Sequence, residues 1–219
     1  MNFDIARKNL IEQQIKSWNI YDPVAIRTLY SVKRENFVPL EYKSFAFSDF
    51  QIPIGFNEFM MSPMVEARIL QASIYESTND ILEIGCGSGF MAAMLSQVCK
   101  SVVTVESNLE LVKNAQNNFR LFKAENIKLF KGNGLVSDDR WSNKQFDVIV
   151  ISGGIRTIPF FLEKSIKKNG KILAFLGSGP LMKAVSFRRN YSGGFVKNIL
   201  FETGINHLKS EDLCNSFQF

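Results

Sequence analysis

Residues 80–90, DILEIGCGSGF, decide the fold of this 219-residue chain. The apolar run before the glycines is typical of a buried strand, and the run after them, FMAAMLSQV, is typical of a helix. Between the two lie Gly85, Gly87 and Gly89. Glycine lets the backbone turn tightly and approach a ligand without a Cβ, and the first N–H groups of a helix have no intrahelical partner. The stretch therefore predicts a strand, a ligand-binding turn and a helix.

Short apolar runs alternate with helical patterns along most of the remaining chain. This alternation predicts an α/β fold with a Rossmann-like, doubly wound, mostly parallel sheet. The expected strands are SVVTVE (101–106), NIKLFKG (126–132), FDVIVIS (146–152) and KILAFLG (171–177), and the expected helices are MVEARILQASIY (64–75), ELVKNAQNNFRLF (110–122) and IPFFLEKSIKK (158–168). FVKNILFETGIN (195–206) could supply a final antiparallel hairpin.

The first third of the chain has a different pattern. Residues 4–34 read as two helices, the second of which begins at Asp22-Pro23, and residues 35–63 lack a sustained period and suggest a packed irregular connection. Ser62-Pro63 reads as the N-cap and first position of the next helix. We expect an N-terminal helical and loop extension, residues 1–65, packed on a domain of residues 66–219, in one structural unit.

Composition narrows the class of protein. The net charge is +5 and the pI is about 9.1, but the Lys and Arg residues are scattered, and Lys167-Lys168 fits a helix C-terminus. The three cysteines lack CxxC spacing, so we expect reduced thiols without a zinc site. The start does not resemble a secretion signal, and the apolar runs are far shorter than the ~20 residues that span a bilayer. These features predict a cytoplasmic protein without a membrane segment.

The glycine turn is reinforced by an acidic residue about twenty positions on. Glu106 ends the next expected strand, where its carboxylate would accept hydrogen bonds from both hydroxyls of a ribose. The spacing ExGxGxG resembles the first motif of class I S-adenosylmethionine methyltransferases, KGNGL (131–135) resembles their adenine motif, and FDVIVISGG resembles the strand that floors their active site. The bland alternative is a structural turn in another α/β protein. The resemblance implies S-adenosylmethionine as cofactor, bound by Glu83, Gly85, Cys86, Gly87, Ser88, Gly89, Glu106, Asn133 and Gly134.

The N-terminal residues narrow the resemblance to the protein-L-isoaspartate O-methyltransferase family. The matching pieces include Arg7, NFVP (36–39), AFSD (46–49) and QIPIG (51–55), in family order. With the motifs above, the resemblance covers roughly residues 7–177. It implies methyl transfer to the α-carboxylate of an isoaspartyl residue. A carboxylate is already ionised at neutral pH and needs no general base, so we expect alignment and exclusion of water to supply most of the catalysis.

One loop departs from this family. After PIG the family pattern is x, glycine, glutamine, threonine, isoleucine, serine, glutamine, proline, whereas this chain reads FNEFMMSP (56–63). Phe59 therefore takes the threonine position and Met61 the serine position, and Glu58 and Ser62 complete the candidate substrate-loop residues. We expect Phe59 and Met61 to face the substrate pocket. For Phe56 and Met60, the pocket and a role in packing the N-terminal helices onto the sheet are weighed equally. Loss of the hydroxyl donors places isoaspartyl activity in doubt.

Three accounts of the loop stay open: activity retained through backbone donors, retuning for a more apolar acceptor, or loss of catalysis with binding kept. The expected partner is a protein, peptide or small-molecule acceptor, and the chain is expected to be a monomer or weak oligomer. A non-catalytic cofactor-binding protein and a methyltransferase acting on RNA are the alternatives. ISGG lacks the paired prolines and aromatic residue typical of enzymes that methylate amino groups of nucleic acids, so nucleic acid is the less favoured partner. His207 reads as a structural or surface residue.

Overall fold

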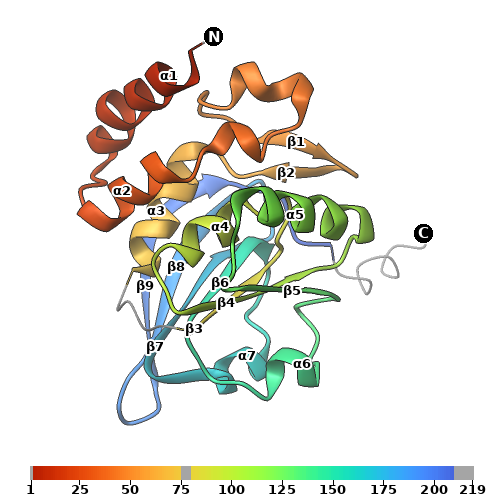
Figure 1. Ribbon diagram of the computed structural model, residues 1–219. Coiled ribbons are helices and arrows are strands. Elements are labelled where there is room, and N and C mark those ends of the chain that lie inside the picture. The colour runs from red at the N-terminus through yellow and green to blue at the C-terminus, as the bar shows by residue number, and fades with distance from the viewer. Residues whose placement is uncertain (1, 75–79, 210–219) are drawn as a thin grey trace, which may run out of the picture.

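A computed structural model describes residues 2–74 and 80–209 of the chain (Figure 1). Its centre is a seven-stranded sheet of order β5-β4-β3-β6-β7-β8-β9. The first five strands in this order are parallel, and β8 and β9 run antiparallel at one edge. The strands are β3 Asp80–Ile84, β4 Ser101–Glu106, β5 Ile127–Lys131, β6 Phe146–Ile155, β7 Ile166–Leu176, β8 Leu181–Arg189 and β9 Phe195–Gly204. The predicted doubly wound, mostly parallel sheet is confirmed.

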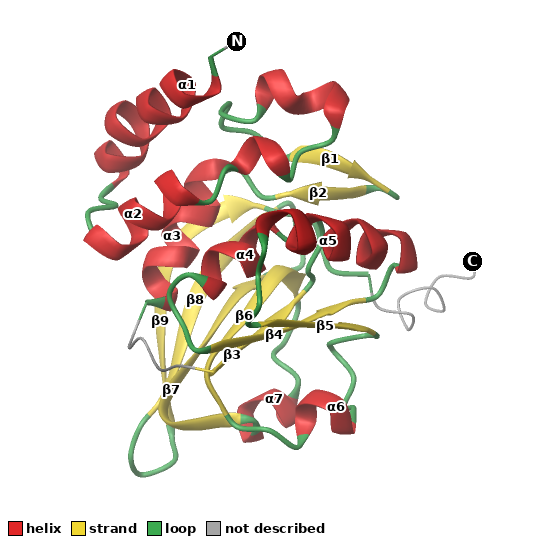
Figure 2. Ribbon diagram, in the orientation of Figure 1, coloured by secondary structure: helices red, strands yellow, loops and turns green. Residues whose placement is uncertain are grey.

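Helices cover both faces of the sheet (Figures 1 and 2). Helices α3, α4 and α5 lie on the face toward the N-terminal segment, and α6 and α7 lie on the other. Their bounds are α3 Pro63–Ser73, α4 Phe90–Ser96, α5 Leu109–Phe122, α6 Asp139–Ser142 and α7 Phe160–Lys164. Helix α5 shows why these bounds arise: the Asn108 side chain accepts hydrogen bonds from two backbone N–H groups of the first turn, and Lys123 ends the helix in the left-handed region.

The N-terminal segment forms a layer above this face of the sheet (Figure 1). Helix α1, Phe3–Asn9, continues through a π turn, Leu10–Ile15, to Trp18, and α2 spans Pro23–Ser31 with Asp22 as its N-cap. Two short 3-10 helices, Arg34–Asn36 and Leu40–Phe45, precede a hairpin of β1, Ile52–Gly55, and β2, Glu58–Met60. The predicted helix pair and its irregular connection are confirmed, although the connection contains a hairpin.

A buried arginine ties this layer to the sheet domain. The Arg34 guanidinium pairs with the Glu66 carboxylate on α3 and donates hydrogen bonds to the carbonyls of Ala46, at 2.9 Å, and Met61, at 2.8 Å. Both charged side chains are buried, and burial lowers the pKa of Arg34 to about 9. One side chain thus fixes the two ends of the segment that carries the hairpin. The surrounding apolar cluster is continuous from Ile11 in the N-terminal layer to Phe90 on α4.

The predicted helix over 158–168 is wrong in its second half. Helix α7 ends at Lys164, and β7 begins at Ile166. Lys167 therefore does not cap a helix: its Nζ lies 3.2 Å from an Asp80 carboxylate oxygen and 2.9 Å from one of Asp147, at the starts of β3 and β6. Two carboxylates at neighbouring strand ends attract the ammonium more strongly than the C-terminus of a one-turn helix could.

The C-terminal strands differ partly from the sequence expectation. Residues 195–206 supply one strand, β9, rather than a whole hairpin, and its partner is β8. Sequence reasoning assigned no strand to β8. The predicted helix over 64–75 is confirmed as α3 up to Ser73, while Tyr75 lies outside the described residues.

Three sequence expectations concern the cysteines, a metal site and membrane-spanning segments. Cys86 and Cys99 are free thiols, as predicted, whereas Cys214 lies outside the described residues. No cluster of metal-ligating side chains occurs within 2–74 and 80–209. Over the same ranges, every helix is too short or too polar to cross a bilayer.

Candidate active site

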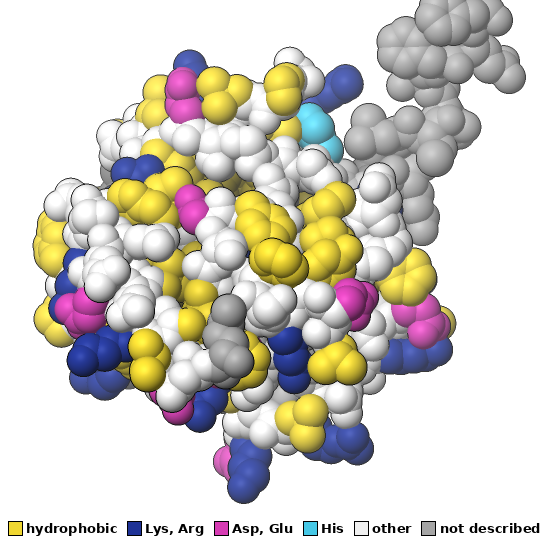
Figure 3. All heavy atoms as spheres, turned by 90° about the horizontal axis from the view of Figure 1, so that it is seen from above, with side chains coloured by type: hydrophobic (Ala, Val, Ile, Leu, Met, Phe, Trp, Pro, Cys, Tyr) yellow, Lys and Arg dark blue, Asp and Glu magenta, His cyan; other side chains and the backbone are white. Residues whose placement is uncertain are grey.

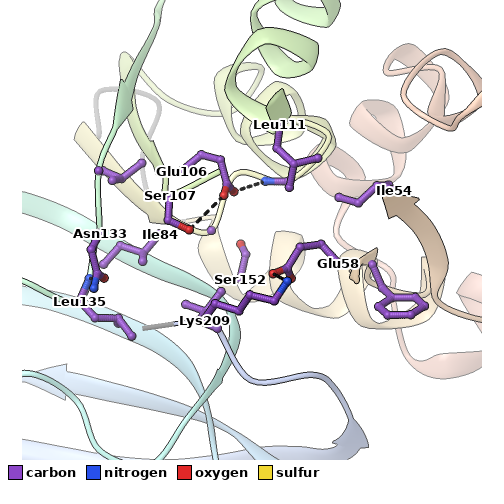
Figure 4. Close-up of a pocket in the computed structure, with 17 residues that line it drawn as sticks. Ile54, Glu58, Ile84, Glu106, Ser107, Leu111, Asn133, Leu135, Ser152 and Lys209 are labelled. Carbon is purple, nitrogen blue, oxygen red and sulfur yellow. Dashed lines mark hydrogen bonds and ion pairs between the residues drawn. The ribbon is translucent and has the colours of Figure 1, made fainter. Parts of the chain in front are cut away.

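The carboxyl ends of the parallel strands open into a pocket, here called the central pocket, with a volume of about 530 Å³ that includes its open mouth (Figure 4). It has two sides. The sheet wall comprises Ile84, Gly85, Gly87, Val105, Glu106, Ser107, Leu111, Gly132, Asn133, Gly134, Leu135 and Ser152. The outer wall comprises Ile54, Glu58, Phe59, Leu208 and Lys209.

Glycines make the turn at the end of β3 possible. Gly85, Gly87 and Gly89 all have positive φ, at 89°, 54° and 86°, which L side chains rarely adopt. A Cβ on Gly89 would lie 2.6 Å from the Phe119 ring, so this glycine serves helix packing. Gly85 and Gly87 line the pocket, whereas Gly89 does not.

Glu106 connects the glycine turn to β4. One of its carboxylate oxygens accepts a hydrogen bond from the Gly87 backbone N–H at 2.9 Å, and the other accepts from the Asn108 backbone N–H at 2.9 Å. The carboxylate is nearly buried, yet Glu106 lines the pocket. The second of these oxygens also accepts from the Ser107 hydroxyl at 3.4 Å, whereas the oxygen bonded to Gly87 keeps a lone pair that can accept a hydrogen bond from a ligand.

The remaining predicted cofactor residues divide into two groups. Asn133 and Gly134 line the pocket, and the Asn133 side-chain oxygen accepts from the Leu135 backbone N–H at 3.0 Å. Three others are buried behind the wall: Glu83, Cys86 and Ser88. These three side chains do not line the central pocket, and the Glu83 carboxyl instead accepts a hydrogen bond from the buried Thr104 hydroxyl.

Glu83 lies beneath the pocket floor. Its carboxyl oxygens accept hydrogen bonds from the hydroxyls of Thr104, at 2.6 Å, and Ser152, at 3.1 Å. Burial, with a smaller contribution from the negative charge of Glu106, raises the pKa of Glu83 to about 8. Ser152 itself lines the pocket. Glu83 therefore contributes to the pocket only indirectly, because it holds in place the Ser152 hydroxyl that lines it.

The candidate substrate-loop residues lie in different environments, some in the pocket and some in the core. Glu58 and Phe59, which is 37% exposed, line the pocket as expected. The expectation that Met61 faces the pocket is wrong: it is 7% exposed and packs in the core, where its carbonyl binds Arg34. Met60 is also buried, but Phe56 is 51% exposed at the hairpin tip. Met61 follows Met60, the last residue of β2, so the strand does not determine the direction of its side chain; Arg34 holds its backbone carbonyl instead.

Ser62 lies outside the central pocket and serves as the N-cap position of α3. Its side chain makes no capping hydrogen bond. The Asp49 carboxylate instead accepts from the Met64 backbone N–H at 3.3 Å, so the first turn is capped from a distance along the chain.

Sequence reasoning missed the C-terminal part of the pocket. Residues 205–209, here called the C-terminal strap, run from the end of β9 past the end of β6, where the Gly154 N–H donates to the Asn206 carbonyl at 2.8 Å and the Leu208 N–H donates to the Gly154 carbonyl at 2.9 Å. Leu208 then packs so closely over Gly85 and Gly153 that a Cβ on either would lie within 2.7 Å of it. No local motif in the strap indicates this position, because it depends on the sheet.

Lys209 closes the outer wall (Figure 4). Its Nζ lies 3.1 Å from a Glu58 carboxylate oxygen and also donates to the backbone carbonyl of Phe56. His207, beside it, pairs with Gly154 and is partly exposed, in agreement with a structural or surface role. Elsewhere, the face seen from above carries its Lys and Arg side chains apart from one another (Figure 3).

Comparison with known proteins decides the family. A model of the protein-L-isoaspartate(D-aspartate) O-methyltransferase family matches residues 5–204. The chain belongs to this family. A protein-L-isoaspartate O-methyltransferase of Petrotoga mobilis is 30% identical over 180 residues, which cover 81% of this chain and 83% of the relative. One from Pelobacter propionicus is 27% identical over 215 residues, covering 97% and 88% of the two chains.

A solved structure shows the same fold. The Plasmodium falciparum protein-L-isoaspartate O-methyltransferase, in complex with S-adenosyl-L-homocysteine, superposes with a TM-score of 0.78 at 19% identity, over 95% of this chain and 99% of the other. The family resemblance predicted from the sequence is confirmed. The chain is accordingly an S-adenosylmethionine-dependent methyltransferase with the class I methyltransferase fold and an N-terminal helical extension.

Proposed function

We propose that the chain transfers the methyl group of S-adenosylmethionine to a carboxylate of a protein or peptide, with the α-carboxylate of an isoaspartyl residue as the first acceptor to test. The observation that carries this proposal is the hydrogen bond from the Gly87 N–H to Glu106 within the central pocket. It joins the backbone turn and the carboxylate in one wall. The family to which the chain belongs supports the acceptor class.

The sheet wall fits the cofactor chemically. Gly85 and Gly87 line the pocket without side chains of their own, and Glu106 retains a lone pair for a ribose hydroxyl. Asn133 offers an amide beside Gly134 for the adenine. When bound, S-adenosylmethionine supplies an electrophilic methyl group on a sulfonium.

The residues of the pocket then have to bind and align the acceptor. A carboxylate acceptor is ionised at neutral pH, so no side chain has to remove a proton. Phe59, Leu208 and the floor around Ser152 would exclude water from the line of attack, which strengthens the electrostatic attraction between the reacting groups. The apolar hairpin is compatible with this chemistry.

The proposal is tested by incubating the protein with labelled S-adenosylmethionine and an isoaspartyl peptide, with the normal aspartyl peptide as control. We expect a base-labile methyl ester on the isoaspartyl peptide alone. Cofactor binding without ester on either peptide would contradict the proposal and support the non-catalytic alternative.

The hairpin is tested with two variants at the family's polar positions. Phe59→Thr places a hydroxyl in the pocket, and we expect it to raise kcat/KM for the isoaspartyl peptide by about tenfold, the effect of one hydrogen bond to a charged group. Met61→Ser is the matched control, because its hydroxyl would lie in the core. It should give no gain in activity and cost about 2–3 kcal/mol in the free energy of unfolding.

A further inference from the structure

The central pocket contains two carboxylates and one ammonium group. Glu58 and Glu106 carry the negative charges, and Lys209 is the one cation among the described residues that line it. An acceptor whose reacting group is itself a carboxylate would meet electrostatic repulsion at this pocket if no cation were present. The position of Lys209 therefore bears directly on which acceptors can enter.

The backbone of the strap determines that position. Two hydrogen bonds hold Asn206 and Leu208 to Gly154, and the Leu208 side chain fills the space over Gly85 and Gly153. Gln51 also donates a hydrogen bond to the Gly204 carbonyl at 2.9 Å, just before the strap. Lys209 thus follows a fixed segment and lies in the outer wall of the pocket, beside Glu58.

The contacts of the ammonium leave it able to bind a ligand. A lysine ammonium has three N–H donors. Two of them point to the Glu58 carboxylate and the Phe56 carbonyl, and in Figure 4 Lys209 reaches Glu58 across the pocket rather than away from it. The third donor has no partner among the described residues. At 54% exposure, the side chain is accessible to an incoming group.

We propose that Lys209 binds the acceptor's carboxylate and determines the preference of this site for anionic acceptors. This inference rests on the proposed function and deepens it. The hairpin carries Phe59 in the pocket where the family pattern has threonine, and the strap supplies a donor from a distant part of the chain. Glu58 orients the ammonium before the acceptor arrives and competes with the acceptor for it.

The alternative is that the ion pair between Lys209 and Glu58 has a purely structural role. An ion pair this exposed stabilises a protein by about 1 kcal/mol at most, so as a latch alone it would hold the strap weakly. The two roles predict different signs for the effects of the Lys209 and Glu58 variants on acceptor binding. If the pair were a latch, removal of either charge would loosen the outer wall in the same way, whereas a recognition role makes the two removals act in opposite directions.

The test measures binding of an isoaspartyl peptide, by calorimetry, to the full chain saturated with S-adenosylhomocysteine. The neutral control is the same peptide with the acceptor carboxylate replaced by a carboxamide. We expect Lys209→Met to raise the Kd of the isoaspartyl peptide by about tenfold. The Kd of the carboxamide peptide and that of S-adenosylhomocysteine should stay within about twofold. Glu58→Gln should lower the Kd of the isoaspartyl peptide by about threefold, because it removes a competing charge.

Lys16→Met is the matched control variant, since Lys16 forms a similarly exposed ion pair with Glu12 outside the pocket. The inference is overturned if Lys209→Met weakens both peptides equally, if it weakens neither, or if Lys209→Met and Glu58→Gln both weaken binding. If the ester forms but peptide binding does not depend on Lys209, this inference alone is overturned. Lys209-dependent binding without ester would support it and overturn the proposed function, while absence of both overturns both.

Discussion

The two walls of the central pocket are built in different ways. The sheet wall comes from the ends of neighbouring strands, where backbone hydrogen bonds and glycine turns set the geometry. The outer wall joins the hairpin to a strap 153 positions away in the sequence, through side-chain contacts of Lys209. The first depends on the sheet, and the second on a few charged and apolar side chains. The two sides of one pocket can therefore differ greatly in how firmly they are held in place.

Removal of Glu66 should have the largest effect, because it loosens the foundation of the outer wall. Glu66→Ala leaves the Arg34 guanidinium buried without its counter-charge, and we expect a loss of about 3–5 kcal/mol in the free energy of unfolding. Urea denaturation measures this. Glu12→Gln, which breaks an exposed pair with Lys16, is the control and should cost less than about 1 kcal/mol. Equal effects of the two variants would refute the role assigned to Arg34.

Glu83 should give the sheet wall a pH-dependent stability. Its pKa is raised from an ordinary value of 4.5 to about 8 by burial. Below about pH 4.5 the carboxyl is protonated in both states. Between about pH 4.5 and 8 only the unfolded chain loses the proton, so stability should fall as pH rises through this window, by on the order of a few kcal/mol, and become constant above it.

The control for this pH dependence is Glu83→Gln, which cannot ionise. Its free energy of unfolding should vary less between pH 5 and 8 than that of the wild type, in urea titrations at a series of pH values. The assignment fails if the two proteins show parallel pH profiles.

Loss of the Glu106 charge should weaken binding of the cofactor at the sheet wall and leave peptide binding nearly unchanged. Glu106→Gln keeps the shape of the side chain but removes charge-assisted hydrogen bonds, so we expect the Kd for S-adenosylmethionine to rise by about 10- to 100-fold. Calorimetry measures the change, with Glu110→Gln in the exposed first turn of α5 as control. The isoaspartyl peptide should still bind within about threefold. A Kd for cofactor that does not change would remove Glu106 from the site.

The smallest effect is expected at the hairpin tip. Phe56 and Asn57 have φ of 56° and 58°, the left-handed region that a tight hairpin requires and that a bulky residue adopts at a cost. Because Phe56 is half exposed, Phe56→Gly loses little packing, and we expect about 0.5–1 kcal/mol of added stability in thermal unfolding. Phe50→Gly, at another exposed phenylalanine without positive φ, should not stabilise the protein. A loss of stability in Phe56→Gly would show that the ring packs on something.

These two walls also explain what could be predicted from the sequence. The strand, glycine turn and helix at 80–90 are local patterns, so this part of the sheet wall follows from them, and the family resemblance follows from the N-terminal motifs NFVP and QIPIG. Lys167 was misplaced because its carboxylate partners come from two other strands. Met61 was misplaced because its position relative to a family motif says nothing about the buried Arg34, which holds its carbonyl in the core. Leu208 and Lys209 were missed because the sheet, and no motif, brings the strap to the hairpin.

The strap has a consequence for synthesis of the protein. Residues 84–134, which supply most of the sheet wall, leave the ribosome well before the strap does. Until residues 205–209 have been made, the pocket lacks its ammonium group and part of its outer wall. A chain terminated before the strap would therefore keep the sheet wall and lose one side of the pocket.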